Sequence, residues 1–113
     1  MTLYHSQKGI PEEVKKALPT KPMWLHYSRH AEVARYNDRY GVAPELQQLD
    51  PALAQVIEVE TENDRPVKVV YRTNVNPQYD LCLVTNIPTG LVRTVWMNKV
   101  SDTHQTLNYS RYQ

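Results

Sequence analysis

The hydrophobic pattern changes at Ala54, and this change constrains the fold more than any other feature of the sequence. From this residue onward, apolar and polar side chains alternate with a period of two, which predicts β-strands. We expect strands over residues 55–61, 67–74, 79–87 and 91–97. The connections between them are short and rich in Asn, Asp, Pro and Gly, which favour turns. Because short connections join antiparallel neighbours, the sequence predicts a four-stranded antiparallel meander.

The third of these strands is apolar on both of its faces, which predicts a central position in the sheet. It contains Cys82, the one cysteine of the chain, so no disulfide framework is possible. We expect this thiol to be buried and unreactive. The expected core of the sheet consists of Val69, Leu81, Leu83, Val95 and their neighbours.

The N-terminal half carries signals for helices. Pro11 suits the first position of a short helix. Ser28 is a suitable N-cap and Gly41 a suitable C′ residue, so a second helix is expected from Arg29 to Tyr40. A further short helix over residues 44–50 is left open. The predicted fold class is therefore α+β, with two or three N-terminal helices packed on a four-stranded antiparallel β-meander.

The length of 113 residues predicts one domain with a single core. Within it we expect a flexible arm over residues 1–9, a helical part over 10–50, the sheet over 54–98 and a polar C-terminal segment over 99–113. No run of ~18 apolar residues is present, which argues against a membrane span. The N-terminus also lacks the apolar core of a signal peptide, so the expected location is the cytoplasm.

The stretch from Leu91 to Asn108 begins as a strand and continues as a run of polar residues. A strand followed by a polar segment can place Thr94, Asn98 and His104 at one edge of the sheet. An imidazole can take a proton from a ribose 2′-hydroxyl and return one to a leaving oxygen, which makes His104 a candidate catalytic residue. The alternative is a solvent-facing histidine in a C-terminal tail.

Three groups of residues resemble a superfamily of small ribonucleases and toxins that includes barnase, EndoU, the tRNase colicins and the RelE-type toxins. Its members share an N-terminal helical part followed by a four-stranded antiparallel meander. The segment Tyr27–Ala31, with Arg35 and Arg39 further along, is similar to their helix that carries His-Ala and then arginine. The segments similar to their successive strands are Val69–Arg72, Leu81–Val84 and Arg93–Asn98. The resemblance covers roughly residues 24–108 and implies action on RNA.

We therefore assign candidate roles in a cleavage that starts with attack by the 2′-hydroxyl. His104 and His30 would exchange protons, and Thr94 and Asn98 would position the scissile phosphate. The residues that would hold phosphate or stack bases are Arg35, Arg72, Arg93, Tyr71 and Trp96. Each also has an ordinary structural explanation, such as an exposed sheet arginine or a core aromatic. No metal and no cofactor are expected, because the sequence contains no ligand cluster and no Gly-rich phosphate loop.

The sequence leaves two classes of function open. The first is an RNA-binding, metal-independent endoribonuclease of toxin-like type. The second is a non-catalytic protein-interaction module, either an inhibitor or a host-modulating factor, on the same fold. The net charge of +1 and the eight tyrosines favour the second class, since tyrosine is a common interface anchor and RNA binding needs a local basic patch.

Overall fold

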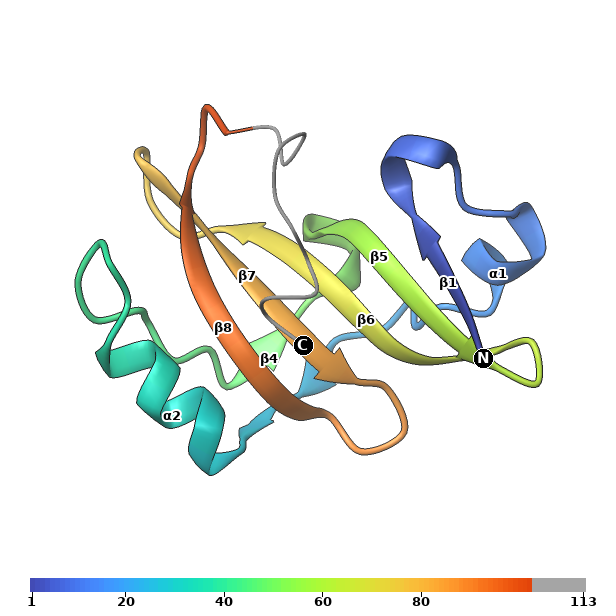
Figure 1. Cartoon of the computed structure of the whole chain (residues 1–113), viewed down its shortest axis with the longest axis horizontal. Coiled ribbons are helices and arrows are strands. Elements are labelled where there is room, and N and C mark those ends of the chain that lie inside the picture. The colour runs from blue at the N-terminus through green and yellow to red at the C-terminus, as the bar shows by residue number, and fades with distance from the viewer. Residues whose placement is uncertain (103–113) are drawn as a thin grey trace.

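A six-stranded mixed sheet forms the centre of the molecule in the computed structural model, which describes residues 1–102 (Figure 1). The strand order is β1-β5-β6-β7-β8-β3. The short strand β3 runs parallel to β8, and every other neighbouring pair is antiparallel. The strands are β1 (Thr2–His5), β3 (His26–Tyr27), β5 (Gln55–Glu62), β6 (Arg65–Asn74), β7 (Tyr79–Asn86) and β8 (Leu91–Lys99).

The remaining elements are short and lie between β1 and β5 in the sequence. A separate two-stranded sheet pairs β2 (Met23–Trp24) with β4 (Gln48–Leu49). The helices are α1 (Glu12–Lys16) and α2 (Arg29–Tyr36), together with 3₁₀ turns η1 (Ser6–Lys8) and η2 (Pro51–Leu53). In the described part of the chain, no helix is both long enough and apolar enough to span a bilayer.

The predicted fold class is wrong, because the described part of the chain is mostly sheet, with 44% of its residues in strands and 19% in helices. The four strands expected from the period-two pattern are present as β5–β8. Four further strands were missed: β1 and β3 belong to the six-stranded sheet, and β2 and β4 form the separate pair. The expected arm over residues 1–9 contains β1, which pairs with β5 through Tyr4 opposite Val59, and β3 pairs with β8. Strands of two to four residues are too short to show a period, so pairing with an available sheet edge determines them.

The helix boundaries also differ from the prediction at their C-terminal ends. The helix α2 ends at Tyr36, and Asn37 closes it by donating its side-chain amide to the carbonyl of Val33 at 2.9 Å. Gly41 has a φ of +110° but lies in the following turn, where its N–H donates to Asp38. The helix left open over residues 44–50 does not form, because Gln47 and the strand β4 pair with the segment around β2.

The start of α2 is as predicted, with Ser28 as its N-cap. The Ser28 Oγ accepts from the N–H of Ala31 at 3.0 Å and donates to the carbonyl of Arg93 at 3.2 Å. Replacing Ser28 with alanine should therefore lower the free energy of unfolding by about 1 kcal/mol in urea denaturation. Ser28→Asp keeps the acceptor for the helix but loses the donor to the Arg93 carbonyl, so it should recover part of the loss. Equal losses in both variants would contradict a capping role.

The sheet has two differently packed faces. The face that packs against the helices, called the helix face, carries Val69, Tyr71, Leu83 and Val95, and Ala31 of α2 and Val14 of α1 belong to the same buried cluster. The opposite face, called the Trp96 face, carries a smaller cluster of Ile57, Val70, Cys82, Val84 and Trp96. The expected core and the buried Cys82 are confirmed, and burial raises the pKa of this thiol to about 12.

Candidate functional site

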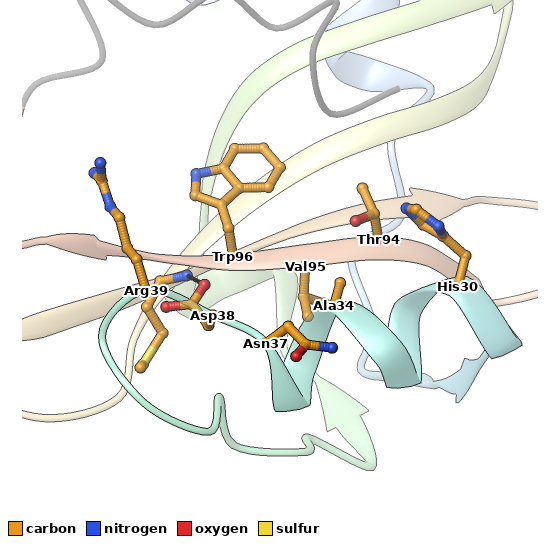
Figure 2. Close-up of a pocket in the computed structure, with 9 residues that line it drawn as sticks. His30, Ala34, Asn37, Asp38, Arg39, Thr94, Val95 and Trp96 are labelled. Carbon is orange, nitrogen blue, oxygen red and sulfur yellow. Dashed lines mark hydrogen bonds between the residues drawn. The ribbon is translucent and has the colours of Figure 1, made fainter.

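A cleft of about 310 Å³ lies between α2, the loop that follows it, and the outer side of β8 (Figure 2). We call it the β8 cleft. It exists because β3 pairs with only the first two residues of β8, Leu91 and Val92, and the helix packs beside the rest. The residues that line it are His30, Ala34, Asn37, Asp38, Arg39, Thr94, Val95, Trp96 and Met97.

The strand β8 places the cleft residues Thr94 and Trp96 on one face of the sheet. Strand alternation puts these two side chains and Asn98 on the Trp96 face, where they lie opposite Val84, Cys82 and Asp80 of β7. The register shifts between Val84 and Thr85, so Arg93 is the extra residue of a β-bulge. The predicted grouping of Thr94 with Asn98 therefore holds in the structure, whereas the Arg93 side chain is exposed and does not line the cleft.

Asp38 attaches the loop after α2 to the free edge of β8. Its Oδ1 accepts from the N–H of Met97 at 2.9 Å, and its Oδ2 accepts from the N–H of Tyr40 at 3.1 Å. The carboxylate thus satisfies a strand N–H that no neighbouring strand reaches. It also fixes the position of Arg39, the next residue in the chain.

His30 and Arg39 supply the titratable and cationic groups of the cleft. Both are exposed, and Figure 2 shows that their side chains extend toward the same side of β8 as Thr94 and Trp96. The His30 imidazole points toward Thr94, and the Arg39 guanidinium lies on the Trp96 side. The cleft therefore combines an exposed imidazole and guanidinium with a hydroxyl and an indole whose residues are only 6% and 7% exposed.

Two of the arginines predicted to hold phosphate have structural partners instead. Arg35 is buried, donates its Nε to the carbonyl of Ala43 at 3.0 Å, and forms an ion pair with Glu32 at 2.9 Å. Arg72 is 5% exposed and pairs with Asp80 at 2.6 Å. Its Nη2 also donates to the carbonyl of Lys99 at 3.0 Å, so this side chain ties β6 to the end of β8.

The other predicted residues are scattered. Tyr71 lies in the core on the helix face and is 1% exposed, so it cannot stack a base; burial raises the pKa of its hydroxyl to about 12. Asn98 is buried on the Trp96 face beyond the cleft. His104 lies outside the described residues, and its role stays a prediction.

The sequence patterns gave no site role to Asp38 or Arg39. Both lie within the helix that was expected to continue to Tyr40. The signal that could have found them is the pair Asn37-Asp38, since both residue types favour helix ends and turns over helix interiors. Within residues 1–102, no group of three or more His, Cys, Asp or Glu side chains could hold a metal ion.

Comparisons with protein families, with curated proteins and with solved structures found no match to this chain. The resemblance to small ribonucleases therefore stays a prediction from the sequence, and the chemistry of the β8 cleft is the remaining basis for a function.

Proposed function

We propose that the protein binds single-stranded RNA at the β8 cleft and cleaves it without a metal ion, in a cytoplasmic setting. The observation that carries the proposal is the convergence of His30 on α2, Arg39 on the following loop and Thr94 on β8 at one cleft. An imidazole, a guanidinium and a hydroxyl are the groups that transesterification of a phosphodiester needs.

The charge distribution around the cleft also favours an anionic ligand. Four exposed cationic residues lie on α2, on the loop after it and on β8, namely Arg29, Arg39, Arg93 and Lys99. The carboxylate of Asp38, which also lines the cleft, is already bonded to two backbone N–H groups. The net charge of the whole chain is only +1, so attraction of RNA to the cleft depends on local cations such as these.

The proposed reaction begins when His30 takes the proton from a ribose 2′-hydroxyl. The 2′-oxygen then forms a bond to the adjacent phosphorus, and the bond between phosphorus and the 5′-oxygen of the next nucleotide breaks. Arg39 offsets the charge that grows on the non-bridging oxygens, and Thr94 donates a hydrogen bond to one of them. The leaving 5′-oxygen takes a proton from a general acid, and the sequence predicts that His104 is the residue that exchanges protons together with His30. The products are a 2′,3′-cyclic phosphate and a 5′-hydroxyl end.

A non-catalytic protein-interaction module is the second candidate function. It is favoured by the large apolar side chains that α2 and β2 expose, with Trp24, Val33 and Tyr36 each more than half exposed. Tryptophan and tyrosine are common anchors of protein interfaces.

Incubating the purified protein with single-stranded RNA in excess EDTA distinguishes the two functions. We expect cleavage to persist without metal ions and to leave cyclic phosphate ends, detected by mass spectrometry of the fragments. Thr94→Val removes the hydroxyl at nearly constant volume and should slow cleavage. Intact RNA after incubation with well-folded protein would overturn the enzymatic proposal, whereas cleavage that EDTA abolishes would overturn the mechanism.

A further inference from the structure

A second cleft, of about 590 Å³, lies where the loop after α2 meets the ends of β6, β7 and β8. It is largely apolar and aromatic, with amide side chains on one wall. Its lining residues include Tyr40, Val42, Tyr79, Asn74, Asn76 and Met97. Met97 also lines the β8 cleft, so the two clefts are neighbours. We call the second one the tyrosine cleft.

Two aromatic rings line the tyrosine cleft, and two cations lie near one of them. The rings of Tyr40 and Tyr79 have centroids 5.0 Å apart and are tilted by 31°. The guanidinium of Arg39 lies 4.7 Å from the centroid of the Tyr40 ring, and the Lys99 ammonium lies 5.9 Å from it on another element. Both tyrosines are only half-buried, whereas both cations are exposed. An aromatic surface flanked by positive charge suits a group that is flat and attached to an anion.

The amides of the tyrosine cleft are held in fixed positions. Asn74 donates its Nδ2 to the carbonyl of Asn76 at 2.8 Å and to Asp80 at 2.9 Å. Asn76 accepts with its Oδ1 from the N–H groups of Gln78 and Tyr79, both at 2.8 Å. These hydrogen bonds use the nitrogen of the Asn74 amide and the oxygen of the Asn76 amide, and they orient the other atom of each amide. The oxygen of Asn74 and the nitrogen of Asn76 can thus serve a ligand as an acceptor and a donor.

We propose that the tyrosine cleft binds a nucleobase of single-stranded nucleic acid, next to a phosphate held by Arg39. Arg39 is the link, because it lines the β8 cleft and also covers the Tyr40 ring of the tyrosine cleft. A base packs against the exposed parts of the two tyrosine rings, its edge bonds to the asparagine amides, and its phosphate lies toward Arg39 and Lys99. The inference rests on the proposed function for the choice of ligand, but it does not require cleavage.

The test uses a fluorescently labelled single-stranded DNA octamer, which lacks the 2′-hydroxyl and cannot be cleaved by the proposed reaction. Binding is measured by fluorescence anisotropy at low salt. Tyr40→Leu keeps the apolar volume but removes the aromatic ring, and should weaken binding by about 5- to 100-fold. Tyr36→Leu is the matched control, because Tyr36 is an exposed tyrosine at the end of α2 that does not line the tyrosine cleft. We expect this control to bind like the wild type.

Asn76→Asp provides a second variant in case Tyr40→Leu does not fold. Asp retains the oxygen that accepts from Gln78 and Tyr79 but replaces the donor with a negative charge. It should weaken binding by about 5-fold or more. Uridine monophosphate should compete with the octamer, and ribose 5-phosphate should compete much less because it lacks the base.

The outcomes separate this inference from the proposed function. Octamer binding that depends on Tyr40, together with intact RNA, would support the base site and overturn the cleavage. RNA cleavage together with unchanged octamer binding by Tyr40→Leu and Asn76→Asp would overturn the base site alone. Equal competition by uridine monophosphate and ribose 5-phosphate would show that the cleft binds phosphate without contacting a base, and would contradict the inference.

Discussion

Replacing His30 with alanine should slow RNA cleavage by about 10²–10⁴-fold, because positioned proton transfer contributes about that factor to the rate. The imidazole is exposed at the first turn of α2 and points toward Thr94, so its removal takes away the proposed proton acceptor without opening the core. The initial rate of cleavage of a short labelled RNA measures the effect. The thermal unfolding temperature should change little, since surface substitutions outside such a site are usually within about 0.5 kcal/mol.

His26→Ala is the matched control for His30→Ala. His26 is an exposed histidine of β3, four residues earlier in the chain, and it does not line the β8 cleft. We expect its cleavage rate to equal that of the wild type. Similar loss of activity in both variants would show that neither imidazole acts specifically at the cleft. Full activity of His30→Ala would remove His30 from the proposed mechanism.

Replacing Arg72 with methionine should lower the free energy of unfolding by about 3–5 kcal/mol, the usual cost of removing one partner from a buried ion pair. The guanidinium lies 2.6 Å from Asp80 and bonds to the carbonyl of Lys99, so the variant leaves a partly buried carboxylate and a carbonyl without this donor. Urea denaturation measures the loss. Arg93→Met, at the exposed bulge of β8, should change stability by no more than about 0.5 kcal/mol.

A double variant tests the reason for the Arg72 effect. Asp80→Ala combined with Arg72→Met removes both charges, and should cost less than Arg72→Met alone because no unpaired carboxylate remains. A small stability loss in Arg72→Met, accompanied by loss of RNA binding, would instead favour the phosphate-holding role that the sequence predicts for Arg72.

The proposed site shows how far a strand pattern can predict chemistry. Alternation along β8 correctly grouped Thr94 with Asn98, because side-chain direction alternates regularly on the C-terminal side of the bulge at Arg93. The alternation could not predict that α2 and the loop after it pack beside β8. The position of Arg39 depends on Asp38, whose carboxylate bonds to an N–H of β8 that lies 59 residues away in the sequence. No local pattern contains that contact.

The two misplaced arginines and Tyr71 have a common explanation. Arg35 and Arg72 belong to residue types that usually lie at the surface, and both are buried because a carboxylate and a backbone carbonyl meet each guanidinium. Tyr71 and Val70 lie on opposite faces of the sheet, as strand alternation predicts. The packing of Ala31 and Val14 against the sheet determines that the face of Tyr71 is the one covered by the helices. A period of two shows which side chains share a face of the strand, but it does not show which face packs against the helices.

The sequence by itself determined the elements that local physics decides: the four strands β5–β8, the central position of β7, the N-cap at Ser28 and the burial of Cys82. Each follows from side-chain periodicity or from a hydrogen bond within a few residues. Only the tertiary structure decided the additional short strands β1 to β4, the early end of α2 and the composition of both clefts. These features depend on edge pairing and on side chains distant in the sequence, because a short segment adopts its conformation from the partner that satisfies its backbone.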